Sequence, residues 1–276
     1  MAQYEVWRSE RTQILYLPHK YSSRLYVEEF WNDRVVQTLF SEYWWTSIPI
    51  ALVYVLIVHT MQWAMRDRKP FDLKRPLLFW NAGLAVFSAE VLFSVRTYGL
   101  RATVSYSVNP REPAAFWACA FALSKVAELA DTLFVVLRKR PLIFLHWYHH
   151  AVVLIYVWHS ACELTAAGRW FIFMNYAVHS VMYTYYAVAA AGYRLPKWMS
   201  MAVTSAQTLQ MLIGLVISFW VLRLKLSGVI VQQSYDNLGL CFAIYASFAA
   251  LFIHFFKRSY LGKKSSSVPR KTDKSD

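Results

Sequence analysis

Charged residues and cysteines are scarce in this sequence of 276 residues. Asp, Glu, Lys and Arg make up 16% of the chain and hydrophobic residues 57%, in runs too long for the elements of a soluble core. The three cysteines, Cys119, Cys162 and Cys241, lie within or at the end of such runs and form neither a disulfide framework nor a metal-binding motif. A Gly-rich phosphate-binding loop is also missing. The expected solvent of this protein is therefore a lipid bilayer.

Seven stretches are long and apolar enough to cross the hydrocarbon layer, which takes about 20 residues of helix. They lie near 43–65, 77–98, 114–137, 142–161, 170–191, 198–222 and 238–256. The sequence therefore predicts an all-α integral membrane protein with seven transmembrane helices. We expect three parts: a non-cytosolic N-terminal segment (1–42) without a cleavable signal peptide, the seven-helix membrane domain (43–260), and a disordered, basic, cytosolic tail (261–276).

The net charge of +13 indicates topology rather than nucleic-acid binding, because the basic residues cluster in alternate connections. These clusters are Arg66, Arg68, Lys69, Lys74 and Arg75; Arg138, Lys139 and Arg140; Arg194 and Lys197; and Lys257, Arg258, Lys263 and Lys264. The positive-inside rule places these connections and the C-terminus in the cytosol, and the N-terminus across the membrane. Arg223 and Lys225 are exceptions on the opposite side.

Polar side chains inside the spans are the main functional signal, since each ionisable group there costs at least ~2.5 kcal/mol and usually faces a cavity or a site. Four spans carry such residues on one helical face. In KVAELADT they are Lys125, Glu128, Asp131 and Thr132; in HWYHH, His146, His149 and His150; in NYAVHSVMYTYY, Asn175, His179, Tyr183 and Tyr186; and in TSAQTLQ, Thr204, Gln207 and Gln210.

Each of these faces also has a purely structural interpretation. Lys125 and Glu128 are spaced to neutralise each other within one helix, which leaves Asp131 to find a partner on a neighbouring helix. Tyrosines at helical spacing often only pack or anchor at the membrane interface, and glutamines often only hydrogen-bond between helices. Three histidines on one face, His146, His149 and His150, are much harder to explain by packing alone.

The depths of these residues favour a common site. At about 1.5 Å of rise per residue, Glu128, Asp131 and the three histidines lie roughly 7–14 Å below the cytosolic end, and His179, Gln207 and Gln210 roughly 15–20 Å below it. Unrelated packing residues would rarely converge in this way. We therefore expect a site in the cytosolic half of the bundle, entered from the cytosol.

Imidazole is the reactive group available in this layer, where no serine or cysteine nucleophile is recognisable. Burial disfavours the imidazolium form, so neutral histidine is available as base, metal ligand or nucleophile. Membrane di-iron oxidases and hydroxylases also carry HxxHH but need about eight or more histidines in several boxes. Of the eight histidines here, His19, His59, His159 and His254 stand alone. A metal site would therefore need Glu128, Asp131 and His179, from other motifs, as additional ligands. A seven-helix receptor or transporter, with a proton or ligand path, is a further alternative.

The four motifs, in this order and spacing, resemble those of the ELO family of very-long-chain fatty acid elongases over about residues 40–262. HWYHH and the residues before it are similar to the branch that acts on saturated and monounsaturated acyl-CoAs. The resemblance implies an endoplasmic reticulum enzyme whose helices two to seven form a barrel around an acyl tunnel open to the cytosol. It also implies condensation of acyl-CoA with malonyl-CoA to 3-oxoacyl-CoA, CO2 and CoA, without a metal or other cofactor.

The same resemblance implies roles for individual residues. His149 would attack the thioester and hold an acyl-imidazole, while His179 would activate malonyl-CoA or stabilise its enolate. The groups around them would orient and polarise the reactants: His146, His150, Asp131 and Asn175 in catalysis, and Lys125, Glu128, Tyr183, Tyr186, Gln207 and Gln210 in substrate binding. Apart from the resemblance, Arg138, Lys139 and Arg140 at the cytosolic mouth are suited to the CoA phosphates, while the positive-inside rule alone also accounts for them. Expected partners are a second copy of the chain and the ketoreductase, dehydratase and enoyl reductase of the elongation cycle, with no nucleic acid.

Overall fold

A computed structural model describes residues 4–8, 12–21, 25–68, 96–190 and 193–261. Six long helices in these ranges match six of the seven apolar stretches: α3 (Ser47–Ala64), α5 (Pro113–Leu137), α6 (Phe144–Glu163), α7 (Gly168–Ala190), α8 (Lys197–Leu226) and α9 (Tyr235–Phe256). Most of the stretch at 77–98 lies outside the described residues, as do the tail after 261 and the basic residues Lys69, Lys74, Arg75, Lys263 and Lys264. Residues 96–105 are helical.

Three described segments are both long and apolar enough to cross a membrane: Asp33–Ala64, Lys197–Leu226 and Tyr235–Leu261. The first joins α2 (Asp33–Tyr43), the short 3-10 helix η1 (Trp44–Thr46) and α3; the last joins α9 and a π-helical turn, η3 (Lys257–Leu261). The remaining long helices, α5, α6 and α7, carry the polar motifs. The prediction of a helical membrane protein is therefore confirmed in its coarser form.

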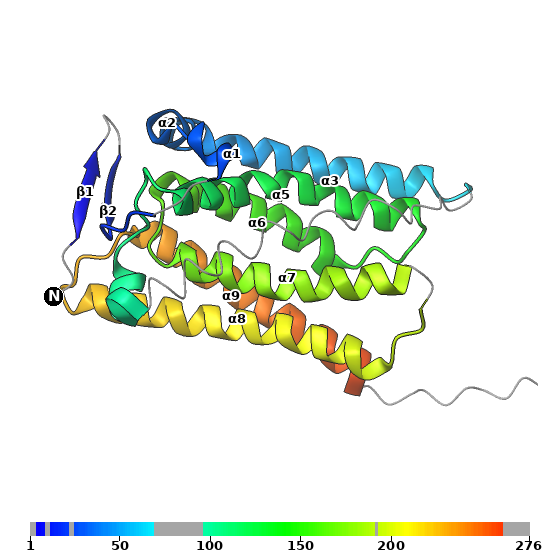
Figure 1. Cartoon of the computed structure of the whole chain (residues 1–276). Helices are drawn as coiled ribbons and strands as arrows, with labels where there is room; N and C mark the ends of the chain where they lie inside the picture. Colours follow the sequence, from blue (N-terminus) through cyan, green and yellow to red (C-terminus); the bar gives the residue numbers. More distant parts are fainter. Residues whose placement is uncertain (1–3, 9–11, 22–24, 69–95, 191–192, 262–276) are drawn as a thin grey trace, which may run out of the picture.

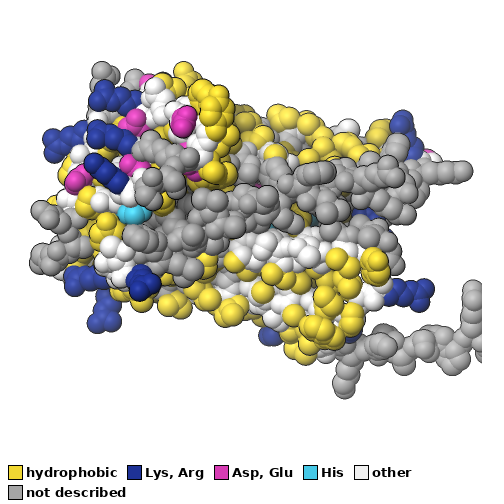
Figure 2. All heavy atoms as spheres, in the orientation of Figure 1, with side chains coloured by type: hydrophobic (Ala, Val, Ile, Leu, Met, Phe, Trp, Pro, Cys, Tyr) yellow, Lys and Arg dark blue, Asp and Glu magenta, His cyan; other side chains and the backbone are white. Residues whose placement is uncertain are grey.

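The long helices pack side by side with alternating direction (Figure 1). Along the bundle, α5 packs on α6, α6 on α9, α9 on α8, α8 on α7, and α7 on α5, while α3 packs on α5 and α6. Alternation brings the connections at 65–68, 138–143 and 193–196 and the segment after α9 to one end. We call this the basic end, because it holds Arg66, Arg68, Arg138, Lys139, Arg140, Arg194, Lys197, Lys257 and Arg258. The charged side chains visible there in Figure 2 are mainly Lys and Arg, whereas the other end shows Lys and Arg together with most of the visible acidic side chains.

The opposite end, which we call the hairpin end, is formed by a two-stranded sheet and the connections near 106–112, 164–167 and 227–234. Strands β1 (Glu5–Arg8) and β2 (Gln13–Tyr16) pair antiparallel, with Trp7 opposite Ile14, and the short helix α1 (Tyr26–Glu29) leads towards α2. Both Trp7 and Ile14 are buried, and they pack in a cluster with Val108, Ala114, Ala115 and Leu164. Nothing in the sequence pattern of the first 42 residues predicts this hairpin.

Gln232 ties the chain segments of the hairpin end together. Its backbone N–H donates to the carbonyl of Ser105 (2.8 Å), and its carbonyl accepts from the N–H of Ala166 (2.8 Å). Its side-chain Oε1 accepts from the backbone of Leu15 (2.9 Å), while Nε2 donates to the carbonyl of Glu163 (2.8 Å). One residue thus joins the hairpin, the end of α6 and two connections through groups that would otherwise lack partners.

Gly214 allows α8 to approach α9 closely. A Cβ atom at this position would lie 2.2 Å from Cε1 of the buried Tyr245 ring. The Tyr245 ring also packs against the ring of Phe171, with 4.9 Å between the centroids. We expect Gly214→Ala to displace Tyr245 and to cost about 1–3 kcal/mol in stability. The measurement is thermal unfolding in detergent. Gly239→Ala on α9 is the matched control, because a Cβ there meets nothing within 4 Å; equal melting temperatures for the two variants would contradict the expectation.

Candidate active site

A buried ion pair lies in the middle of α5. Lys125 Nζ is 2.6 Å from Glu128 Oε1, one helical turn away, and the two side chains are only 3% and 8% exposed. Ser124 donates a second hydrogen bond to the same carboxylate oxygen (3.2 Å), and the Lys125 ammonium also lies over the Phe121 ring, 4.0 Å from its centroid. The predicted pairing of Lys125 with Glu128 is therefore confirmed.

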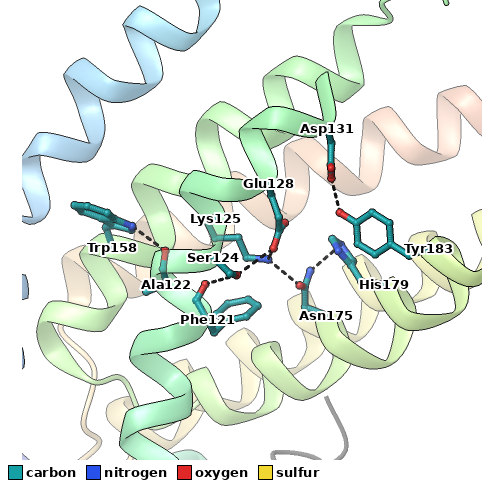
Figure 3. Close-up of polar contacts among 10 residues, drawn as sticks. All are labelled: Phe121, Ala122, Ser124, Lys125, Glu128, Asp131, Trp158, Asn175, His179 and Tyr183. Atoms are coloured by element: carbon teal, nitrogen blue, oxygen red, sulfur yellow. Dashed lines mark hydrogen bonds and ion pairs between the residues drawn. The ribbon is translucent and has the colours of Figure 1, made fainter. Parts of the chain in front are cut away.

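The ion pair continues into α7 through an amide (Figure 3). Lys125 Nζ donates to Oδ1 of the buried Asn175 (3.1 Å), and the Nδ2 atom of Asn175 lies 3.1 Å from Nε2 of His179. Four polar side chains from two helices thus form one hydrogen-bonded chain, which we call the relay: Glu128, Lys125, Asn175 and His179. The polar faces expected on these two helices do meet.

Asp131 finds its partner on the neighbouring helix, as expected. Its carboxylate accepts a hydrogen bond from the hydroxyl of Tyr183 on α7, one turn beyond His179 (Figure 3). The next residue, Thr132, is buried and shares a hydrogen bond with the hydroxyl of Tyr54 on α3 (2.6 Å). The polar face of α5 is therefore engaged by both α7 and α3.

The three histidines of HWYHH lie in the first two turns of α6. The rings of His146 and His150 are 4.8 Å apart and those of His149 and His150 5.8 Å apart, between centroids. His149 also contacts α9, with its ring centroid 4.7 Å from that of Phe248. Nε2 of His146 and Nδ1 of His149 are buried and have no hydrogen-bond partner among the described residues. Such unpartnered atoms are what a substrate group or a water molecule would satisfy.

The histidines of α6 are near the relay. His179 and Lys125 are close enough to act electrostatically on both His149 and His150. Three helices therefore supply one polar layer inside an otherwise apolar bundle, with imidazoles on one side and an ion pair on the other. Within the described part of the chain, no group of three or more His, Cys, Asp and Glu side chains has an arrangement that could hold a metal ion.

Other residues selected from the sequence lie around this layer. Gln210 is buried on α8, and Gln207 Nε2 is 3.1 Å from the sulfur of Met182 on α7. Tyr186 is half exposed and contacts the ring of Tyr185, so it lies apart from the relay. The basic connection between α5 and α6, 138–140, is at the surface, where Lys139 Nζ donates to the backbone carbonyl of Arg66 (2.7 Å).

Two features of the layer have no signal in the sequence. Tyr54 brings a hydroxyl group from α3 to Thr132, although its span shows no polar stripe. The rings of Phe248 and Phe252, which face His149, belong to an apolar span and look like ordinary packing residues. A pattern of polar residues at helical spacing could not have found either of them.

A small apolar cavity of about 60 Å³ lies between α5, α6 and α7, towards the hairpin end. Its apolar lining includes Ala118, Phe121, Val157, Ala161, Phe171 and Ile172. Val157 is two turns beyond His149 along α6, which places the cavity roughly 12 Å deeper in the bundle. Phe121, which lies beneath the ammonium of Lys125, separates the ion pair from this cavity.

Comparison with known proteins gives a consistent result over most of the chain. Residues 39–268 match the family described as ELO: GNS1/SUR4 family. A Caenorhabditis elegans protein named "Putative fatty acid elongase 4" is 48% identical over 96% of this chain and 98% of its own. Very long chain fatty acid elongase 6 of Drosophila melanogaster is 43% identical (86% of this chain, 79% of its own), and human very long chain fatty acid elongase 3 is 39% identical (83% and 88%).

Proposed function

The chain belongs to the ELO family, GNS1/SUR4, and on that premise we propose that it is the condensing enzyme of long-chain fatty acid elongation, a 3-oxoacyl-CoA synthase. It joins a long-chain acyl-CoA to malonyl-CoA and releases 3-oxoacyl-CoA, CO2 and CoA. The observation that carries the proposal is the buried relay between α5 and α7 together with the three histidines of α6, the helix that packs on α5. The preferred substrates are saturated and monounsaturated acyl-CoAs, and no metal or other cofactor takes part.

The first half-reaction transfers the acyl group to His149. A ring nitrogen with its lone pair attacks the thioester carbon, the C–S bond breaks, and the electron pair leaves on the CoA sulfur, which takes up the imidazole proton. The unpartnered Nδ1 of His149 and the apolar rings around it favour a neutral imidazole, which is a competent nucleophile towards thioesters. His150, whose ring lies against that of His149 and also against that of His146, orients this group together with His146.

The second half-reaction forms the carbon–carbon bond. Malonyl-CoA loses CO2, and the electron pair of the broken bond becomes an enolate at the thioester. The enolate carbon attacks the acyl-imidazole carbon, the C–N bond breaks with its electron pair leaving on the ring nitrogen, and the imidazole takes up one proton from solvent, which is the proton that the overall reaction consumes. His179, held by Asn175, acts at this step, while the pair of Asp131 and Tyr183 fixes α7 against α5 beside it.

The remaining residues define the passage of substrates. Gln207, which contacts Met182 on α7, and the buried Gln210 are assigned to substrate binding from α8, and Tyr186 lies nearer the basic end of α7. Arg138, Lys139 and Arg140 at the basic end are suited to the phosphates of CoA, since guanidinium groups bind phosphate in a bidentate manner. The apolar cavity beyond Phe121 receives the distal carbons of the acyl chain.

The architecture proposed for the whole protein has seven transmembrane helices, with 77–98 supplying the second. Helices two to seven enclose the acyl tunnel as a barrel, and the circuit of neighbours from α5 through α6, α9, α8 and α7 supports this arrangement. The protein resides in the endoplasmic reticulum membrane with the basic end and the C-terminal tail (261–276) in the cytosol and the segment 1–42 on the other side. It works as a homodimer beside the ketoreductase, dehydratase and enoyl reductase of the cycle.

Condensation of labelled malonyl-CoA with acyl-CoA is the direct test of this function. The purified protein in detergent is incubated with palmitoyl-CoA and other chain lengths, and labelled 3-oxoacyl product is measured. We expect product with saturated and monounsaturated long-chain substrates and none without acyl-CoA. Failure to form product at every chain length tried would reject the proposal and return attention to a receptor or transporter.

Filling the cavity should shorten the acyl chain that the enzyme accepts. Ala118 lines the cavity, so Ala118→Leu removes space for the last carbons of the chain. We expect kcat/KM for the longest accepted acyl-CoA to fall about 10-fold relative to a substrate two carbons shorter, as is usual for one or two methylenes in an apolar pocket. Ala120→Leu, on the same helix but outside the cavity lining, is the matched control. An unchanged chain-length profile in Ala118→Leu would mean that the chain ends elsewhere.

A further inference from the structure

The orientation of the Asn175 side chain is determined by Lys125. Nζ of Lys125 donates both to the Glu128 carboxylate and to the atom of Asn175 that faces it, 3.1 Å away. An ammonium group has donors and no acceptor, so the facing atom must be the amide oxygen, Oδ1. Asn175 is buried, and its NH2 group therefore points in the opposite direction, towards His179 (Figure 3).

The orientation of Asn175 in turn determines the tautomer of His179. Nδ2 of Asn175 has only hydrogens to offer, and it lies 3.1 Å from Nε2 of the imidazole. Nε2 must then accept, which requires a lone pair at that atom. In a neutral imidazole the single proton consequently resides on Nδ1. Among the described residues the bond to Asn175 is the hydrogen bond of the His179 ring, and it uses Nε2, so the N–H at Nδ1 is not committed to an acceptor in the protein.

We propose that Lys125 and Asn175 are positioning residues that hold His179 in its Nδ1–H tautomer, so that His179 donates a hydrogen bond to the enolate oxygen of decarboxylated malonyl-CoA. The inference rests on the proposed condensing function and gives His179 one of the two roles open to it. With a lone pair at Nδ1 the ring would act as a base; with a proton there it stabilises negative charge. A preformed donor in a water-poor site needs no reorganisation when the charge develops.

The geometry also explains why two charged residues are kept inside the bundle, where the contacts described for them are with the protein itself. Lys125 is surrounded by the Glu128 carboxylate, Asn175 Oδ1 and the Phe121 ring, so its donors are occupied within the protein. If an uncharged donor replaced Lys125, the Glu128 carboxylate would have no counter-ion. If a group that can both donate and accept replaced it, the side-chain amide of Asn175 could exchange the positions of its oxygen and nitrogen. Lysine, paired with Glu128, removes that ambiguity.

The tautomer can be read directly by nitrogen-15 solid-state NMR of histidine-labelled protein in lipid vesicles. The His179 signals are those missing from His179→Ala. We expect a protonated Nδ1 and an unprotonated Nε2 in the wild-type protein; a protonated Nε2 would overturn the inference. The measurement needs no substrate, so its outcome is independent of whether the protein condenses acyl-CoA with malonyl-CoA.

Asn175→Asp is the variant that reverses the tautomer with least change in shape. A carboxylate still accepts from Lys125 but also accepts from the ring, so we expect the proton of His179 to move to Nε2. Condensation should then fall about 10²–10³-fold in kcat, the usual effect of losing one donor to a developing oxyanion. Formation of the acyl adduct on His149 should persist, because it precedes the malonyl step. A switched tautomer with kcat within about threefold of wild type would overturn the donor role.

Asn237→Asp provides a matched control at the hairpin end. Asn237 is buried and also joins a histidine: Gln233 Nε2 donates to its Oδ1 (3.0 Å), and its Nδ2 lies 2.9 Å from Nδ1 of His159. The same substitution thus alters an equivalent Asn–His pair that is remote from the relay. We expect kcat for condensation to stay within about threefold of wild type in Asn237→Asp, and an equal loss in both variants would overturn the specific role of Asn175.

Discussion

Replacement of His149 with alanine is expected to abolish condensation, with a loss of about 10⁴-fold or more, as is found when the nucleophile of a covalent mechanism is removed. The same change should eliminate the acyl-enzyme. Incubation of the wild-type protein with palmitoyl-CoA in the absence of malonyl-CoA should increase its intact mass by one acyl group, and release free CoA. His149→Ala should show neither change.

The interpretation of this experiment depends on two comparisons. His254 on α9 is exposed, so His254→Ala should form the adduct as the wild type does and exclude a general effect of removing an imidazole. His179→Ala should acylate but fail to condense. An adduct that persists in His149→Ala would show that another residue is the nucleophile, and a wild-type enzyme that condenses without ever forming an adduct would favour direct transfer between the two CoA esters.

Replacement of Lys125 with methionine is expected to destabilise the protein by about 3–5 kcal/mol, because it leaves the Glu128 carboxylate buried without its counter-ion. Both side chains are more than nine-tenths buried, so solvent screens their interaction little. Thermal unfolding in detergent, followed by intrinsic fluorescence, measures the effect. Activity should also be lost, since Asn175 no longer has a fixed orientation.

The double variant Lys125→Met/Glu128→Gln separates these two effects. It removes both charges, so it should regain most of the lost stability. Activity should remain low, because an amide at 128 restores no fixed donor to Asn175 Oδ1. If the double variant were as active as the wild type, the ion pair would contribute only to folding. If it were no more stable than Lys125→Met, the cost would arise from packing around Lys125 rather than from the unpaired charge.

The helices of this protein were largely predictable from sequence because a bilayer imposes a minimum length and requires backbone groups to be satisfied within each segment. The prediction of 114–137 corresponds to α5 at Pro113–Leu137, and 170–191 to α7 at Gly168–Ala190. Spacing within a helix was equally informative. Lys125 and Glu128 pair as their separation of three residues indicates, and the polar faces of α5 and α7 do meet.

Contacts between distant segments were not predictable, because no local pattern encodes which partner a side chain selects. The sequence indicates that Asp131 needs a partner but not that Tyr183 supplies it, 52 residues further along the chain. It offers no reason to connect Gln232 with Leu15, 217 residues away. The hairpin was missed for the same reason: its strands are short, and their burial depends on the connection that precedes α5 and on those that follow α6 and α8.

The two ends of the bundle differ in the hydrogen bonds that hold their segments together, and this difference determines where the helices can separate locally. Gln232 joins several segments of the hairpin end through backbone and side-chain hydrogen bonds, whereas at the basic end the described links include an exposed lysine contact to Arg66 and a hydroxyl pair between Tyr260 and Thr204. Local opening is cheapest where hydrogen bonds are exposed to solvent. The helices should therefore move about the hairpin end as a pivot, with the greatest amplitude at the basic end. If CoA thioesters enter there, as the proposed function requires, thermal separation of the helix ends would admit the acyl chain.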